Sequence, residues 1–221
     1  MPMKRVIMSI LVAVLCSSFL YAQDNKESIA SLNDGGYVLE KARMAFKYIP
    51  DHKRVGEEAK PFMTEDLYES LAAAWDIPDW LDGEMGNEEF LFYFITGNDP
   101  SDRQQIESAT LVYAQKGKYI VDVKYREFWG NVASQNLSSI SLVLVNENGK
   151  ILLDDFGKET KQQCKQYVRE EVSNFLSGKT NQYMKDNQGD GWYTDSHIAD
   201  VNESFKEYLS KYGEFIGRLG K

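Results

Sequence analysis

The alternation of side chains between residues 106 and 156 constrains the fold more than any other feature of the sequence. Successive side chains of a strand point to opposite faces, so a two-residue repeat of apolar and polar residues predicts a strand with one packed face. Such one-sided burial is typical of antiparallel sheets. In YIVDVKYREFW, residues 119–129, two sets of side chains alternate: Tyr119, Val121, Val123 and Tyr125 against Ile120, Asp122, Lys124 and Arg126.

The segments on either side of this strand predict its neighbours. IESATLVYAQ, residues 106–115, precedes it across the short turn KGK, and SISLVLV, residues 139–145, follows it. The turn NENGK then leads into ILLDDF, residues 151–156. Its Asn148-Gly149 pair suits a tight hairpin, because both residue types tolerate positive φ. The sequence therefore predicts three or four consecutive antiparallel strands.

Helical repeats flank the predicted sheet. Apolar residues recur at helical spacing in YVLEKARMAFKYIP, residues 37–50, in MTEDLYESLAAAW, residues 63–75, and in ETKQQCKQYVREEVSNFL, residues 159–176. Thr64 is the predicted N-cap of the second helix, since a threonine side chain can accept a bond from the first helical turn. The order predicts an α+β fold in which N-terminal helices pack on a curved antiparallel sheet of three to four strands.

The C-terminal region, residues 178–221, is predicted to form a polar loop followed by an amphipathic helix that begins with an N-cap at Asp195 or Ser196. A lone amphipathic helix must bury its apolar face. We expect this one to pack on its own domain; docking to a partner chain is the alternative. Its apolar residues recur every three or four positions: Ile198, Val201, Phe205, Leu209, Tyr212, Ile216 and Leu219.

The N-terminal residues predict export. Lys4 and Arg5 precede a short apolar run that ends in Leu20-Tyr21-Ala22, a pattern typical of a cleaved signal peptide spanning residues 1–22. An uncleaved anchor is the alternative, and a lipid anchor at Cys16 is less favoured because Leu15 precedes it. Residues 23–36 are polar and predict a flexible leader.

The predicted mature chain is acidic. Loss of Lys4 and Arg5 leaves 23 basic and 34 acidic side chains, a net charge of −11. This charge disfavours nucleic acid and anionic membrane surfaces as partners. We therefore expect a soluble exported protein, periplasmic or secreted, without stable membrane insertion after removal of the signal peptide.

The chain also resembles a known superfamily over residues 37–177. The stretches PFMTEDLYESL, ATLVYAQKGKYIVDVKY, ILLDDFG and CKQYVREEVSNFL are similar to the cystatin-like cone of the nuclear transport factor 2 superfamily, and nearest to an exported bacterial family of unknown function. Between the second helix and the sheet, WLDGEMGNEEFLFYF departs from the acidic LD-x-DPF stretch typical of that family. The resemblance implies a fold and a compartment, and little about chemistry.

A calcium loop is suggested by DNQGDGWYTDSH, residues 186–197. Asp186, Gln188 and Asp190 stand at positions 1, 3 and 5 of an EF-hand pattern, but His197 occupies position 12, where a bidentate carboxylate is required. A solvated loop is therefore the favoured interpretation. The sequence predicts no cofactor.

Catalytic candidates are few. Asp155 lies at a predicted strand end and Asp99 precedes Pro100 in a predicted turn, so both are weak candidates for a general base. Cys164 lies on the apolar stripe of a helix, which predicts a buried structural thiol.

Aromatic residues are the candidate ligand contacts, because the predicted elements that contain them would line the interior or mouth of a cone. Core packing accounts for most such residues. The candidates are Trp75, Trp80, Phe92, Tyr113, Tyr125 and Trp129.

Three functions follow from these observations. The first is a non-catalytic exported module that binds a small apolar ligand or another exported protein. The alternative is a small lyase or isomerase with a pocket carboxylate as base, and a weaker alternative is docking through the C-terminal helix. A buried carboxylate beside a substrate-sized cavity would count against the first.

Overall fold

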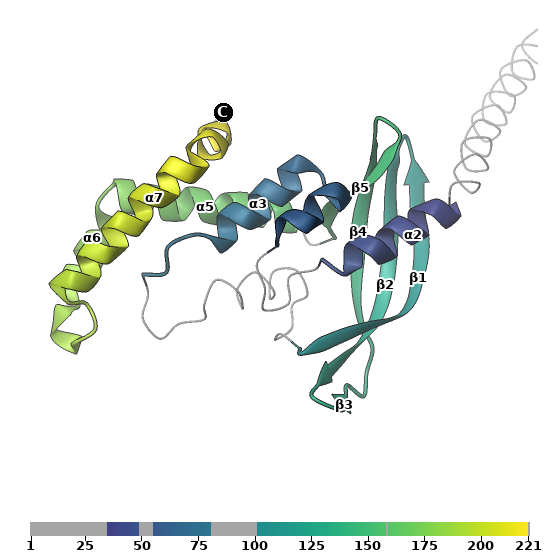
Figure 1. Cartoon of the computed structure of the whole chain (residues 1–221), viewed down its shortest axis with the longest axis horizontal. Coiled ribbons are helices and arrows are strands. Elements are labelled where there is room, and N and C mark those ends of the chain that lie inside the picture. The colour runs from purple at the N-terminus through teal and green to yellow at the C-terminus, as the bar shows by residue number, and fades with distance from the viewer. Residues whose placement is uncertain (1–34, 49–54, 81–100, 158, 221) are drawn as a thin grey trace, which may run out of the picture.

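The computed structural model describes residues 35–48, 55–80, 101–157 and 159–220, and Figure 1 shows an α+β arrangement of helices and one antiparallel sheet. The predicted fold class is confirmed. The helices are α2 (Gly35–Phe46), η1 (Glu57–Phe62), α3 (Glu65–Trp75), α5 (Thr160–Leu176), α6 (Lys179–Asp186), η2 (Gln188–Asp190) and α7 (Asp195–Leu219). The strands are β1 (Arg103–Gln115), β2 (Lys118–Trp129), β3 (Val132–Ala133), β4 (Ser138–Glu147) and β5 (Lys150–Phe156).

The sheet has the strand order β1-β2-β4-β5, and β3 pairs with the end of β2. The structure therefore adds one strand to the predicted meander, because two residues of β3 are too few to show a repeat. Asn148 and Gly149 have φ values of 53° and 84°, as the predicted hairpin requires. The amide of Gly149 donates to the Asn146 side chain at 2.9 Å and closes that turn.

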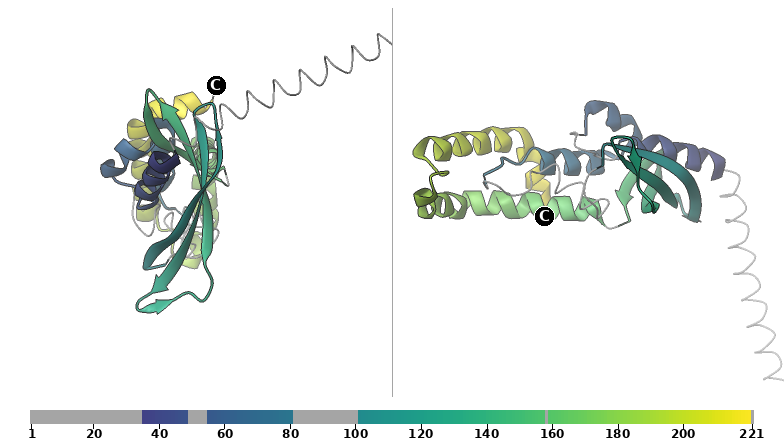
Figure 2. Two further views of the ribbon diagram at one scale, coloured as in Figure 1. Left: turned by 90° about the vertical axis from the view of Figure 1, so that its right-hand side faces the viewer. Right: turned by 90° about the horizontal axis from the view of Figure 1, so that it is seen from below.

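One face of the sheet forms the main core. Helix α2 lies across this face, and the longer helices extend away from one end of the sheet (Figures 1 and 2). The packed row predicted on β2 is confirmed: Tyr119, Val121, Val123 and Tyr125 are buried. Strand β4 contributes Ile140, Leu142 and Leu144 to the same core, and α2 contributes Val38, Ala42, Ala45 and Phe46.

Helix α3 begins at the edge of β5. The amide of Thr64 donates to the carbonyl of Leu153 at 2.8 Å, and the Thr64 side chain accepts from the amide of Leu67 at 3.3 Å. The predicted N-cap is therefore confirmed, and the same residue fixes the helix to the sheet.

The C-terminal region differs from its prediction at two places. Residues 179–186 form the helix α6 instead of a loop. Gly178, with φ at 79°, separates α5 from α6. Helix α6 buries only Thr180 and Met184, too few residues to show a helical repeat in the sequence. Helix α7 is capped by Thr194, whose hydroxyl accepts from the amide of His197 at 3.1 Å, so the prediction of Asp195 or Ser196 as N-cap is wrong.

The apolar face of α7 is buried within the chain, as expected. Tyr208 donates to the carbonyl of Ala73 at 2.9 Å, and Tyr212 donates to the carbonyl of Ala72 at 3.2 Å. The buried residues of α7 are Ile198, Val201, Phe205, Tyr208, Tyr212 and Phe215, so the stripe is rotated from the predicted one near its C-terminal end. None of the described helices is long and apolar enough to cross a membrane.

Candidate functional site

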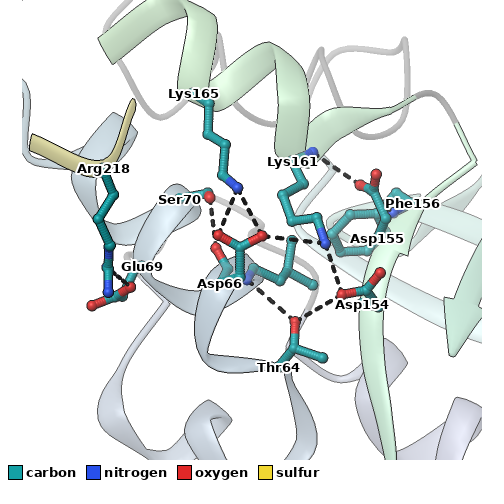
Figure 3. Close-up of polar contacts among 11 residues, drawn as sticks. Thr64, Asp66, Glu69, Ser70, Asp154, Asp155, Phe156, Lys161, Lys165 and Arg218 are labelled. Atoms are coloured by element: carbon teal, nitrogen blue, oxygen red, sulfur yellow. Dashed lines mark hydrogen bonds and ion pairs between the residues drawn. The ribbon is translucent and has the colours of Figure 1, made fainter. Parts of the chain in front are cut away.

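Two groups of polar side chains that contain carboxylates are candidates for a site. The first group lies where α3, β5, α5 and the end of α7 meet, beside a hollow of about 500 Å³ (Figure 3). It contains Asp155, the carboxylate that the sequence suggested as a base. The second group lies on the packed face of the sheet, where β1 faces β2.

A β-bulge places the acidic pair of the first group. Leu144 pairs with Leu153 and Val143 pairs with Asp155, so Asp154 is an extra residue in β5. A bulge interrupts the alternation of a strand and redirects the side chains next to it. As a result Asp154 and Asp155 are both half-buried, instead of pointing to opposite faces.

Asp155 acts as a helix cap. Its Oδ1 accepts from the amide of Phe156 at 2.8 Å and from the amide of Lys161 at 2.9 Å. The N-cap residue of α5, Glu159, makes no capping bond with its own side chain, so Asp155 supplies the acceptor that the first turn needs. Burial raises the pKa of Asp155, against the two backbone bonds that lower it. These contacts account for the residue without catalysis.

Two lysines of α5 balance the remaining carboxylates of this group. Lys161 Nζ lies 2.7 Å from Asp154 Oδ1 and 3.5 Å from Asp66 Oδ2, and Lys165 Nζ lies 2.6 Å from Asp66 Oδ1. Burial opposes the charge of Lys161, but the hydrogen bond and charge of Asp154 raise its pKa overall. Burial likewise opposes the charge of Asp66, but Lys165 lowers its pKa overall.

The same network reaches the end of the chain. Arg218 of α7 pairs with Glu69 of α3, and Thr64 donates to Asp154 Oδ1 at 3.1 Å (Figure 3). Ion pairs and hydrogen bonds thus join a strand to three helices. We interpret this group, which we call the charged network (Thr64, Asp66, Glu69, Asp154, Asp155, Lys161, Lys165 and Arg218), as a structural element. Cys164 next to it is fully buried, and burial raises the pKa of its thiol to about 12, as expected of a structural thiol.

The second group centres on Glu127, which continues the packed row of β2 and is only 4% exposed. Its backbone is held by Ser134, whose amide donates to the Glu127 carbonyl at 2.8 Å. Its Oε2 accepts from the hydroxyl of Ser138 at 2.5 Å. Its Oε1 is buried and has no hydrogen-bond partner among the described residues.

Gln104 of β1 is the residue directly opposite Glu127 in the strand register. Side chains so paired have Cβ atoms about 5 Å apart. The Nε2 atom of Gln104 is also buried and lacks a hydrogen-bond partner in the described part of the chain. A donor and an acceptor therefore lie side by side on two strands, each without a bond. We call Glu127 and Gln104 the polar pair.

A cleft of about 450 Å³ lies beside the polar pair. It is lined by Phe46 and Lys47 at the end of α2 and by residues 102–106, Gln104 among them. The ring of Phe46 packs on that of Tyr125, with ring centroids 5.2 Å apart. Burial, followed by the charge of Glu127, raises the pKa of Tyr125 above its ordinary value.

Searches of protein-family models, curated proteins and solved structures found no match to this chain. The resemblance to the nuclear transport factor 2 superfamily therefore stays a prediction from the sequence.

The structure does not bring the predicted aromatic residues together. Trp80 donates to Glu171 of α5 at 2.8 Å and contacts Tyr183 of α6, so it belongs to the helical part of the molecule. Trp75 packs at the edge of the main core, whereas Tyr113 and Trp129 are 41% and 46% exposed near opposite ends of the sheet. Among the candidates that the structure describes, only Tyr125 adjoins the polar pair. Phe92 and Asp99 lie outside the described residues.

Asp186 and Gln188, two of the three suggested calcium ligands, are used in other bonds. Asp186 Oδ1 accepts from the Gln182 amide at 2.7 Å, and Gln188 donates to Asp195 Oδ1 at 2.8 Å. The side chain of Asp190 lies outside the described part of the structure. Among the described residues, no group of three His, Cys, Asp or Glu side chains is placed to hold a metal ion.

Sequence reasoning missed Glu127 and Gln104. The alternation on β2 places Glu127 two residues after Tyr125, on the same face, so its burial was open to prediction. Gln104 gave no such indication, because β1 has no regular apolar repeat and contains register shifts between Ile106 and Ser108 and between Leu111 and Tyr113.

Proposed function

We propose that this protein is a ligand-binding module whose ligand occupies the cleft and bonds to the polar pair. Because Glu127 is a buried carboxylate beside a cleft of about 450 Å³, which counts against a purely non-catalytic role, catalysis is the second candidate. One observation supports the binding function most strongly: Glu127 and Gln104 face each other in the strand register, and Glu127 Oε1 and Gln104 Nε2 are both buried without partners in the described structure. A buried polar group without a hydrogen bond costs about 1–3 kcal/mol. Proteins retain such costs mainly where function needs them, and a ligand would supply the missing bonds.

The charged network supports the same choice by elimination. Its carboxylates already bond to lysines, hydroxyls and backbone amides, so they offer a ligand little that is unsatisfied. The third function, docking through the C-terminal helix, is disfavoured because the apolar face of α7 is already buried against the rest of the chain.

Protein-observed NMR with a library of small fragments tests this function. The side-chain amide protons of Gln104 are expected to shift for a subset of fragments, because that amide lines the cleft. Gln115 at the far end of β1 is the internal control, since its side chain is exposed and accepts from Tyr113 at 3.0 Å. Fragments that move no resonance of residues 102–106, or that move Gln115 equally, would contradict a site at the polar pair.

Catalysis is the second candidate, and the carboxylate next to a protonated phenol supports it. Glu127 would then serve as the base in a lyase or isomerase, in place of Asp155, with Tyr125 as the proton donor. Fragments that shift Gln104 can be incubated with the protein in deuterated water. Exchange of a carbon-bound hydrogen with the wild type, and its loss in Glu127→Gln, would favour catalysis over simple binding.

We further propose that the protein is exported, on the basis of residues 1–22 alone. The mature chain is then expected to begin at Gln23, and mass spectrometry of the protein secreted from its host measures that end directly. A chain that keeps Met1 would contradict export by cleavage.

A further inference from the structure

We propose that the ligand of the polar pair is a small cation: a flat or apolar body with an amidinium or guanidinium group that donates to both residues. This inference rests on the proposed binding function and specifies the class of ligand. It follows from three features of the site, namely the uncompensated charge of Glu127, the paired position of Gln104 and the apolar side chains of Phe46 and Ile106 that line the cleft.

The charge of Glu127 has no basic partner among the described side chains. Arg126 donates to Glu107 at 3.2 Å and to the carbonyl of Ser134 at 2.7 Å. Arg103 lines the cleft, but its guanidinium carbon lies 3.9 Å from the centre of the Phe128 ring. A buried carboxylate is strongly disfavoured unless a cation or several donors accompany it. Ser138 provides only one donor, so an incoming cation gains more than a neutral ligand.

Gln104 determines which shape the polar group of the ligand must have. An amide side chain can present either its oxygen or its nitrogen after a half-turn about its last bond. Turned in this way, the Gln104 oxygen and Glu127 Oε1 form two neighbouring acceptors on adjacent strands. An amidinium or guanidinium has two or more N–H donors in one plane and can bond to both. One ligand group can then donate to an acceptor on each of the two residues.

The rest of the cleft suits an apolar body. Phe46 and Ile106 line it, and the ring of Tyr125, which does not line the cleft, packs on the ring of Phe46. Aromatic rings favour flat apolar groups and attract cations over their faces. The exposed charged side chains that line the cleft are Lys47, Asp102 and Arg103, and Arg103 stacks on the Phe128 ring, so the preference for a cation rests on the buried Glu127 alone. Asp102 is also held in place, since its Oδ2 accepts from the amide of Gly130 at 2.5 Å.

Three probes with one ring and different heads test the inference: benzamidine is cationic, benzamide is neutral and benzoate is anionic. Each is titrated into the isotopically labelled protein while the Gln104 side-chain amide and the Glu127 backbone amide are followed. Benzamidine is expected to bind with a dissociation constant on the order of 1 mM, as fragments of this size do. We expect it to bind at least about tenfold more tightly than benzamide, and benzoate more weakly still.

Matched variants assign the preference to Glu127. Glu127→Gln is expected to weaken benzamidine binding by about tenfold or more and to remove its advantage over benzamide. Glu107→Gln is the control, because Glu107 is an exposed carboxylate on the facing strand. It should leave all three titrations unchanged. If Glu127→Gln does not fold, Glu127→Asp replaces it; the shorter carboxylate should weaken benzamidine but keep its preference over benzamide.

The possible failures are distinct. If benzamide or benzoate shifts Gln104 and binds as tightly as benzamidine, the cation class is overturned while the binding function stands. If Glu107→Gln weakens benzamidine as much as Glu127→Gln does, the preference belongs to the surface charge and not to the polar pair. If none of the probes and no library fragment moves Gln104, Glu127 and Gln104 are a structural pair and both proposals fail.

Discussion

The charged network and the polar pair both contain buried or half-buried carboxylates, but their partners differ. Asp154 and Asp66 each face a lysine at 2.7 Å or less, and Asp155 accepts two backbone amides. Glu127 is more deeply buried than any of them, yet its carboxylate receives one described hydrogen bond, from Ser138. The charged network, whose carboxylates have several partners, is thus better explained by a role in stability. The polar pair, which lacks partners, is better explained by a role in binding.

This contrast teaches that a concentration of charged residues is a weak guide to function. A network whose members satisfy one another fixes the positions of its helices and strands. A buried group that lacks a partner is energetically unfavourable for the protein alone, so it indicates a ligand that supplies the missing bond. Four measurements test this distinction, and the one with the largest expected effect comes first.

The largest effect is expected from Asp155→Ala. The substitution removes the acceptor for the amides of Phe156 and Lys161 at the start of α5, which should lower the free energy of unfolding by about 2 kcal/mol. For a chain of this size the melting temperature falls by roughly 4–8 °C. Asp155→Asn is the matched control, since its remaining oxygen can still accept. Equal stability of Asp155→Ala and the wild type in urea denaturation would refute the capping role.

Lys161→Met should have the next largest effect. It leaves Asp154 half-buried with the Thr64 hydroxyl as a partner and should lower the free energy of unfolding by about 1–2 kcal/mol. Lys206→Met is the control, because the Lys206–Glu203 pair is exposed, and such pairs contribute about 0–0.5 kcal/mol. Similar losses in the two variants, measured by urea denaturation, would show that the charged network adds nothing beyond a surface ion pair.

Glu127→Gln is expected to have the opposite sign. The amide keeps an oxygen for Ser138 and removes a buried charge that lacks a basic partner in the described structure, so the free energy of unfolding should rise by about 1 kcal/mol. The melting temperature then increases by roughly 2–4 °C. A clear loss of stability would instead place Glu127 among the structural carboxylates, and the contrast between the two regions would disappear.

The smallest effect concerns pH. The folded pKa of Asp66 lies below its ordinary value, so its ion pairs stabilise the fold fully above the unfolded pKa of about 4 and are lost as pH falls through the depressed value. The stability difference between the wild type and Asp66→Asn should therefore shrink as pH falls below about 4. Asp155 opposes this trend in both proteins, because its raised pKa makes protonation favour the folded state. A difference that does not change with pH would contradict the depressed pKa.

Much of the architecture was predictable because it depends on local repeats. The two-residue alternation of β2 predicted which side chains are buried, and Thr64 was identifiable as a cap from its residue type and position. Predictions failed where a repeat was too short or was interrupted. The eight residues of α6 bury two side chains, and the bulge at Asp154 changes the face of Asp155 without any change of residue pattern.

The sequence by itself determined the α+β class, the order of helices and strands, and the packed face of the central strand, since each follows from the spacing of residues near one another in the chain. Only the tertiary structure decided which charged groups have partners. Lys165 and Asp66 are 99 residues apart, and Gln104 faces Glu127 through the register of two strands. Hydrogen bonds act over about 3 Å, so whether a buried carboxylate is satisfied depends on the folded arrangement and is invisible to any local pattern.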